Sequence, residues 1–310
     1  MLFLVTGGAG FIGSHITERL LADGHRVRIL DNFSTGKREN IPDSRDVTVI
    51  EGDVGDFDTV KGCMEDVDIV FHEAAIASVP ETVGNPLASE RVNYRGTVNV
   101  LEAARHAGVR RVIFACSAAV YGDLPELPKR ENMPVKPLSP YAIDKLASEY
   151  ACNVYYELYG LETVALRYFN VFGPRQDPSS PYSGVISIFF DHIKLGRQPA
   201  IYGDGEQTRD FVFVSDVVEA NMRAATSEHA PGNAYNIATG TTVTINVLLQ
   251  TICKLKGTAC SPDYKPAREG DIRHSCADIG RAGKDLDWQP VVEFEEGLAK
   301  LLELAGSELA

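Results

Sequence analysis

A glycine-rich turn lies directly between an apolar run and a helical segment at the start of the chain. Leu2-Phe3-Leu4-Val5 predicts a short buried strand, and residues 14–21 predict a helix. Between them, Gly7 allows a tight bend, Gly10 lets backbone N–H groups approach a pyrophosphate, and Gly13 lets the helix pack closely. The helix N-terminus adds unpaired donors and a partial positive charge. Glycines alone also occur in ordinary hairpin turns, but this strand–turn–helix order predicts dinucleotide binding.

The second predicted strand, residues 27–30, ends in an acidic residue. Asp31 follows the glycine turn at the distance where a carboxylate accepts the hydroxyls of an adenosine ribose. The same carboxylate would repel a 2′-phosphate, and the nearest bases, Lys37 and Arg38, lie past the turn at Gly36. We therefore expect NAD rather than NADP.

A third predicted strand, residues 47–50, also leads to a carboxylate. Asp53 would lie at the carboxyl edge of the sheet, where α/β proteins bind ligands, and it could reach the adenine amine. It could equally cap a helix that begins near Phe57.

Strands and helices alternate along the N-terminal half of the chain. Residues 68–71, 111–115 and 162–168 predict further strands, and residues 87–107 predict a long helix. This alternation predicts an α/β fold with a doubly wound parallel sheet of the Rossmann type. After the fourth strand, Ala74 and Ala75 would let the backbone approach a cofactor, and we expect His72 to be structural.

Beyond residue 170 the pattern becomes mixed. Short strands near 200–202 and 210–213 alternate with helices near 187–195 and 216–226. We expect residues 1–170 to form a dinucleotide-binding domain. Residues 171–310 would form a smaller mixed α/β substrate lobe that returns at least once to the main sheet.

Three polar side chains follow the fifth predicted strand and could carry chemistry. Ser117 lies at the carboxyl end of that strand, and Ser139-Pro140 opens a helix that carries Tyr141 and Lys145. Residues four apart share one helix face, so the lysine ammonium would favour the phenolate and lower the tyrosine pKa towards neutrality. Tyr141 could then act as a general base, with Ser117 bonded to the same substrate oxygen. A Tyr–Lys pair at this spacing is otherwise a common packing pair.

Composition excludes several classes of function. The net charge is −13 and there is no basic run, which argues against nucleic-acid and anionic-membrane partners. Six cysteines without a C-x-x-C pair indicate neither a zinc site nor a disulfide framework, so we expect no metal and a reducing, cytoplasmic location. The apolar run of residues 1–5 is too short for a signal peptide, and no stretch reaches the length of a membrane span.

These motifs together resemble the extended short-chain dehydrogenase/reductases, and within them the nucleotide-sugar epimerases. The resemblance covers essentially the whole chain. It rests on the segments 7–13, 31–32, 53–54, 72–75, Ser117 with 120–122, and Tyr141-x-x-x-Lys145. One departure is Ala119, because many relatives have a sugar-contacting Thr or Ser there.

The resemblance implies NAD as cofactor, a UDP-sugar as substrate, and roles for individual residues. Ser117, Tyr141 and Lys145 would be catalytic. The implied cofactor site comprises Gly7, Gly10, Phe11, Ile12, Gly13, Asp31, Asn32, Thr35, Gly36, Asp53, Val54, Ala74, Ala75, Asn93, Tyr141, Lys145 and Tyr168. The implied substrate site comprises Ser117, Tyr141, Asn170, Arg209, Arg268, Asp271 and Ser275. Two guanidiniums would suit a diphosphate through bidentate bonds, although a single arginine is more often a surface ion-pair partner.

Three functions compete on this basis. The first is a 4-epimerase that interconverts UDP-glucose with UDP-galactose, and their N-acetyl counterparts, through a 4-keto intermediate. The second is another NAD-dependent nucleotide-sugar enzyme, such as a uronate epimerase, dehydratase or reductase. Dehydratase and decarboxylase relatives carry an acid just after the motif serine, where this chain has Ala118 and Ala119. The third is a non-enzymatic dinucleotide sensor, which would have no need of the base.

The resemblance also implies a homodimer and a specificity position. Relatives pair the Tyr–Lys helix with the helix before the fifth strand. Here an apolar stripe of Ile143, Leu146, Ala147, Tyr150 and Val154 could serve, or could face the chain's own sheet. Four residues past the ribose-binding aspartate, relatives with a bulky Tyr exclude N-acetyl groups. Ser275 is small, so we expect both sugar types to fit, unless Ser275 only ends a loop and Arg273 or another side chain fills the space.

Overall fold

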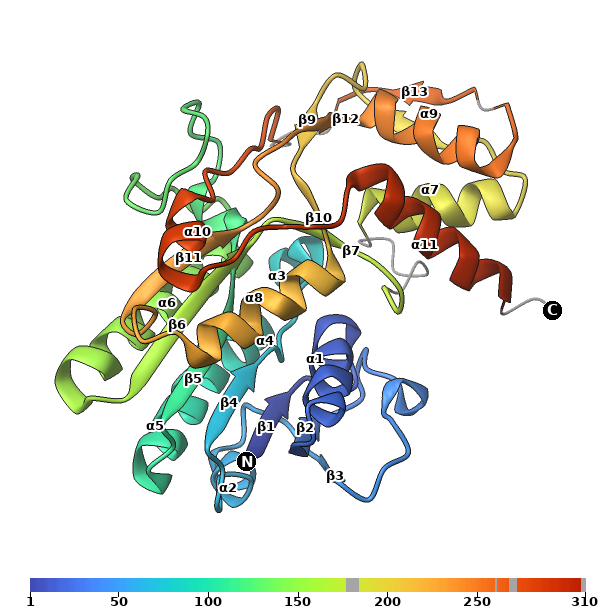
Figure 1. Cartoon of the computed structure of the whole chain (residues 1–310). Helices are drawn as coiled ribbons and strands as arrows, with labels where there is room; N and C mark the ends of the chain where they lie inside the picture. Colours follow the sequence, from blue (N-terminus) through green and yellow to red (C-terminus); the bar gives the residue numbers. More distant parts are fainter. Residues whose placement is uncertain (177–183, 260, 268–271, 308–310) are drawn as a thin grey trace.

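Seven parallel strands form the central sheet in the computed structural model, which describes residues 1–176, 184–259, 261–267 and 272–307 (Figure 1). Their order across the sheet is β11-β6-β5-β4-β1-β2-β3, and each neighbouring pair is parallel. The strands are β1 (Leu2–Thr6), β2 (Arg26–Asp31), β3 (Val47–Glu51), β4 (Ile69–His72), β5 (Arg111–Ser117), β6 (Glu162–Tyr168) and β11 (Asn233–Ile237). The predicted doubly wound parallel sheet is confirmed.

Helices cover both faces of the sheet, each over its own apolar core (Figure 1). One face carries α1 (Phe11–Ala22), α8 (Val214–Thr226) and α10 (Gly280–Leu286). The other carries α2 (Phe57–Gly62), α5 (Gly96–Ala107) and α6 (Pro140–Tyr159), with α3 (Val79–Gly84) and α4 (Pro86–Ser89) beside them. Strand positions alternate between the two cores, as Leu4 and Val5 do, which is the period-2 pattern of a sheet buried on both faces.

The predicted long helix 87–107 is helical over its whole length but not uniform. A π-helical segment, Glu90–Arg95, separates α4 from α5. Short π-helical segments inside α-helices are frequent at functional sites. The helix with the Tyr–Lys pair begins as predicted: Ser139 caps it by accepting a hydrogen bond from the Ala142 N–H, and Pro140 occupies its first turn.

The chain after β6 builds a small lobe and also returns to the main sheet. Phe172, Phe189, Phe211 and Leu248 lie in the core of this lobe. Its elements are β7 (Asn170–Phe172), α7 (Val185–Lys194), β8 (Ala200–Tyr202), β9 (Thr208–Arg209), β10 (Phe211–Phe213), β12 (Val243–Thr244), α9 (Ile245–Lys256), β13 (Asp263–Lys265) and α11 (Phe294–Ser307). Between β10 and β12, the chain forms α8 on the main sheet and then β11, which pairs with β6.

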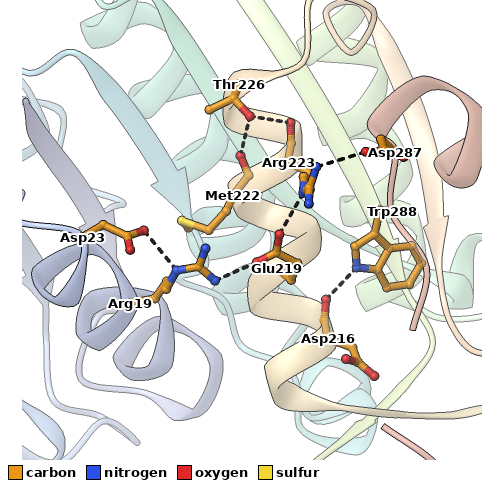
Figure 2. A network of polar contacts seen from close by, with 9 residues as sticks. All are labelled: Arg19, Asp23, Asp216, Glu219, Met222, Arg223, Thr226, Asp287 and Trp288. Atoms are coloured by element: carbon orange, nitrogen blue, oxygen red, sulfur yellow. Dashed lines mark hydrogen bonds and ion pairs between the residues drawn. The ribbon is translucent and has the colours of Figure 1, made fainter. Parts of the chain in front are cut away.

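Polar contacts tie α8 to its neighbours on the sheet, as Figure 2 shows. Arg19 of α1 contacts Glu219 of α8 at 2.7 Å, and Arg223 of α8 reaches Asp287 at 3.3 Å. The buried indole of Trp288 donates to the Asp216 carbonyl at 2.9 Å. The segment that follows α10 is therefore fixed to the start of α8.

The expectations about membrane spans, metal sites and disulfides can be compared with the described residues. None of the described helices is long and apolar enough to cross a membrane. Within the same residues, no group of three or more His, Cys, Asp and Glu could hold a metal ion. The sequence indicated no disulfide framework and did not predict that Cys253 is disulfide-bonded; Cys63, Cys116, Cys152 and Cys276 are free.

Candidate active site

The glycine turn after β1 has the geometry that its sequence predicted. Gly7 has a φ of +71°, and an added Cβ there would lie 2.8 Å from the Ala74 nitrogen. An added Cβ at Gly13 would lie 2.3 Å from the Gly7 carbonyl oxygen, so only glycine lets α1 begin this close to the turn. No described side chain caps the N-terminus of α1. Its first-turn donors and dipole are thus available to a pyrophosphate.

A cavity of about 430 Å³ opens over this turn. Twelve of the predicted cofactor residues line it: Gly7, Gly10, Phe11, Ile12, Gly13, Asp31, Asn32, Thr35, Gly36, Val54, Ala74 and Ala75. The Asp31 carboxylate is fixed there, because it accepts backbone hydrogen bonds from Ala9 at 2.9 Å and Phe33 at 2.8 Å. Arg38 lies over the Phe33 ring and pairs with Glu51.

Two predicted cofactor residues have other partners, and neither is among those that line the cavity. Asp53 accepts a bond from the Gly55 N–H and pairs with Arg91 at 2.7 Å. Desolvation raises the pKa of Asp53, but the hydrogen bonds from Arg91 and Gly55 outweigh it and leave that pKa lowered. The helix-cap alternative for Asp53 was wrong, because Asp56 caps α2.

Asn93 uses its side chain to hold the loop after β4. Its amide makes two bonds to the Ile76 backbone, at 2.8 and 3.1 Å. Asn93 therefore holds Ile76, which lines the cofactor cavity, but does not line the cavity itself. Arg91, which does line the cavity, was missed, because no spacing in the sequence marks it.

A second cavity, of about 300 Å³, holds the predicted catalytic residues. Five predicted residues line it: Ser117 at the end of β5, Tyr141 and Lys145 in the first turns of α6, Tyr168 at the end of β6, and Asn170 at the start of β7. The Ser117 hydroxyl accepts a hydrogen bond from the Ala119 N–H at 3.1 Å, which fixes the side chain at the strand end. The structure thus brings these five predicted site residues to one cavity.

The expected low pKa of Tyr141 is not found. Burial raises the pKa of the phenol to about 12, and a hydrogen bond with Ser117 acts in the opposite direction. The Lys145 ammonium lies 5.8 Å from the phenol ring centroid and donates to the Ala115 carbonyl at 2.7 Å. Burial also lowers the pKa of Lys145. The prediction weighed the lysine charge alone, whereas desolvation is the larger effect at this depth.

A buried ion pair supports the strands beneath these residues. Arg167 of β6 makes two bonds to Glu149 of α6, at 2.6 and 2.8 Å. The Cys116 thiol, next to Ser117, donates to the same carboxylate at 3.2 Å. This pair links α6, which carries the phenol, to the strand ends that form the floor of the cavity.

The predicted substrate residues of the small lobe are partly outside the described chain. Arg268 and Asp271 lie outside the described residues. The Ser275 N–H donates to the Thr208 carbonyl at 3.2 Å, which places Ser275 beside β9 and its Arg209. The guanidinium of Arg273 binds Asp204 through two contacts of 2.7 and 2.8 Å.

Comparisons with known proteins agree with this geometry. A UDP-glucose 4-epimerase of Mycolicibacterium smegmatis is 43% identical over 309 residues, which is 98% of each chain. The structure of a UDP-N-acetylglucosamine 4-epimerase from Methanobrevibacter ruminantium, in complex with UDP-N-acetylmuramic acid, is 41% identical with a TM-score of 0.95. The match covers 99% of this chain and 98% of that one. A UDP-glucose 4-epimerase of Thermus thermophilus in complex with NAD is 40% identical, with a TM-score of 0.89 and 98% coverage of both chains.

The match to a family model includes both cavities and, apart from Leu2, all of the main sheet. It extends over residues 3–238. The uncapped helix start, the glycine positions that leave no room for a Cβ, and the fixed Asp31 carboxylate fit the pyrophosphate and ribose of NAD. The chain belongs to the NAD dependent epimerase/dehydratase family.

Proposed function

We propose that this chain is a nucleotide-sugar 4-epimerase that works with tightly held NAD on UDP-sugars. The observation that carries the proposal is the position of Ser117, Tyr141 and Lys145. They line a cavity that shares residues with the dinucleotide cavity, namely Phe11, Ile12, Glu73, Ala75 and Ala77. A base for the sugar hydroxyl would thereby lie next to the group that takes the hydride from the carbon bearing that hydroxyl.

Tyr141, Ser117 and Lys145 have different roles in the proposed reaction. NAD, held by the N-terminus of α1 and by Asp31, would supply reversible hydride transfer at carbon 4 of the sugar. Tyr141 takes the hydroxyl proton, and Ser117 donates a hydrogen bond to the same oxygen. With a pKa near 12, the phenol of Tyr141 becomes a base only when positive charge favours its ionised form. Lys145, buried in the same cavity, supplies one such charge.

Asp31 supports NAD over NADP. Both of its carboxylate oxygens are fixed by backbone donors in the cavity, so the negative charge cannot turn away from a 2′-phosphate. Arg38, the nearby base, is already engaged by Phe33 and Glu51.

The alternative reactions lack the groups that they require. Ala118 and Ala119 follow Ser117 in a short 3₁₀ turn, and neither can transfer a proton for dehydration or decarboxylation. A sensor that only binds dinucleotide would have no use for Tyr141 and Lys145 buried together beside the cofactor cavity.

The small lobe supports a broad sugar range. Serine at position 275 is smaller than tyrosine by a phenol, and the guanidinium of Arg273 is engaged by Asp204. We therefore include the N-acetyl sugars among the substrates. Ser275→Tyr would remove the N-acetyl activity selectively by a clash. Ser275→Ala is the matched control, since it keeps the space, and it is expected to retain both activities. Equal rates for both sugar types in Ser275→Tyr would contradict this gate.

A homodimer is part of the proposal. On α6, Ile143, Tyr150 and Val154 are 55%, 53% and 48% exposed, whereas Leu146 packs against the core. An exposed apolar stripe on a long helix beside α5 suits pairing with a second copy. Light scattering that gives a monomer mass at micromolar concentration would count against it.

One experiment tests the activity directly. The purified chain is incubated without added NAD with UDP-glucose, UDP-galactose, their N-acetyl forms and UDP-glucuronate, and the products are resolved chromatographically. We expect an epimer from both neutral sugar types. Carbon dioxide release from UDP-glucuronate would indicate a decarboxylase, and no product from any sugar would refute the proposal.

A further inference from the structure

One carboxyl group lies where the two cavities meet. Glu73 directly follows β4, and its N–H donates to the Thr6 carbonyl at 3.1 Å. It lines both the dinucleotide cavity and the cavity of Ser117 and Tyr141. A dinucleotide whose pyrophosphate rests on the α1 N-terminus must pass this junction for its nicotinamide end to reach Tyr141. Neither the motif of residues 72–75 nor the catalytic roles given above explain the position of Glu73.

The Glu73 carboxyl group is held in place by other elements of the fold. The Tyr168 hydroxyl donates to its Oε1 at 3.0 Å. Asn221 of α8 donates to the same hydroxyl oxygen at 2.8 Å, and its amide also donates to the Val217 carbonyl at 2.8 Å. The position of the carboxyl group is therefore set by β4, β6 and α8 together. A side chain that only faced solvent would not be held by contacts from three elements.

Glu73 can change its charge near neutral pH, whereas most of the titratable groups that face it stay neutral there. Burial raises the pKa of Glu73 to about 7, against the opposing effects of Tyr168 and Lys145. Burial also raises the pKa of Tyr141 to about 12 and that of Tyr168 well above its usual value, so both phenols are neutral near pH 7. Cys116 is likewise kept as a neutral thiol by burial, which raises its pKa. On its own strand, burial lowers the pKa of His72 to about 3, so Lys145 and Glu73 are the two charges of this region that matter near neutrality.

We propose that the negative charge of Glu73 favours the oxidised form of the bound cofactor between turnovers. This inference rests on the use of NAD in the proposed function. A nicotinamide ring is a cation when oxidised and neutral when reduced. A carboxylate at the junction stabilises the cation and has little effect on the neutral form.

This charge effect favours return of the hydride. In the first half-reaction, carbon 4 loses a hydride to the ring and its hydroxyl loses a proton to Tyr141; both return in the second half-reaction. If the keto sugar escaped before the return, the enzyme would be left reduced and inactive. A negative charge beside the ring makes the reduced state less stable, and so shortens the time in which escape could occur.

The test is the midpoint potential of the bound cofactor, measured on the purified holoenzyme in a spectroelectrochemical titration at 340 nm without sugar. At pH 8.5, Glu73→Gln should bind the reduced form on the order of tenfold more tightly relative to the oxidised form. That change raises the midpoint potential by about 30 mV. Glu73→Asp, which keeps the charge, should remain close to wild type.

Two further variants separate charge from structure. Tyr168→Phe removes the hydrogen bond to Glu73 but no charge, and its potential should move much less than that of Glu73→Gln. Glu81→Gln is the matched charge control, because Glu81 lines only the dinucleotide cavity and is exposed. Solvent screens that charge, so the potential should stay near wild type. A Glu73→Gln protein that keeps its thermal midpoint but shows an unchanged potential, or a shift equal to that of Glu81→Gln, would overturn the proposal.

The wild type alone provides a second test if Glu73→Gln does not fold. Its bound potential, compared with that of free NAD at each pH, should rise as the pH falls from 8.5 to 5.5, because protonation removes the charge of Glu73. A constant difference over this range would overturn the proposal. A holoenzyme preparation without NAD would instead contradict the proposed function, so the two failures are distinguishable.

Discussion

The buried Arg167–Glu149 pair should make a much larger contribution to stability than an exposed pair of the same geometry. The side chains of Arg167 and Glu149 are 5% and 3% exposed, and two contacts of 2.6 and 2.8 Å join them. Glu149→Gln keeps the shape but leaves the arginine charge buried and uncompensated. Removal of one partner of such a pair costs about 3–5 kcal/mol. For a chain of this length the unfolding entropy is about 0.65 kcal/mol/K, so the thermal midpoint should fall by about 5–8 °C.

The exposed pair between Arg273 and Asp204 is the matched control. It also has two contacts, of 2.7 and 2.8 Å, but its side chains are 53% and 58% exposed. Solvent screens exposed pairs, so Asp204→Asn should move the midpoint by less than about 2 °C. The combined change of Arg167→Met with Glu149→Leu should recover much of the loss from Glu149→Gln, because it removes the uncompensated charge.

The assay is thermal unfolding at fixed NAD concentration, followed by far-ultraviolet circular dichroism and by the fluorescence of the single tryptophan, Trp288, which is buried. Agreement of the two signals would show that one transition is being measured. Equal midpoint shifts in Glu149→Gln and Asp204→Asn would refute the argument, since burial is the main difference between the pairs.

Further predictions concern the site and its pH dependence. Tyr141→Phe should lower turnover by about two orders of magnitude or more through loss of the general base, and near wild-type rates would remove Tyr141 from the mechanism. Gly13→Val should abolish NAD retention, measured as absorbance of the released cofactor, because even a Cβ would lie 2.3 Å from the Gly7 oxygen. Asp31→Ser should weaken the preference for NAD over NADP in binding titrations, and an unchanged preference would show that another group sets it. His72 has a pKa of about 3 when folded and its usual 6.5 when unfolded, so the unfolded state binds more protons between these values. Stability should therefore fall as the pH drops below about 6.5, by up to about 1.4 kcal/mol per pH unit, and urea midpoints of His72→Gln should show a shallower fall.

The sequence was most informative where one local pattern determines both conformation and chemistry. The turn glycines were predicted from spacing, because a backbone that approaches a phosphate within ångströms excludes a Cβ, as the contacts at Gly7 and Gly13 show. The meeting of Ser117 with Tyr141 was predictable for a similar reason. Parallel strands bring their carboxyl ends to one edge, and the capped start of α6 sets the position of Tyr141.

The sequence was less informative where a residue's contacts come from partners distant in sequence. Asp53 and Arg91 are 38 residues apart, and no spacing rule pairs them, so the carboxylate was assigned to adenine or to a helix cap. Asn93 is buried on the π-helical segment, and only the folded chain shows that its amide faces the Ile76 backbone.

The pKa of Tyr141 is an instance of the same limitation. Its i, i+4 neighbour Lys145 is visible in the sequence, but the burial that outweighs the lysine charge comes from several elements. Desolvation is a property of the assembled cavity, and it acts on Tyr141, Lys145 and Glu73 at once. In each case it favours the neutral form, so the pKa rises for the phenol and the carboxyl group and falls for the ammonium. A local pattern can therefore locate the proton-transfer groups of this site, but only the packed structure determines which of them are charged.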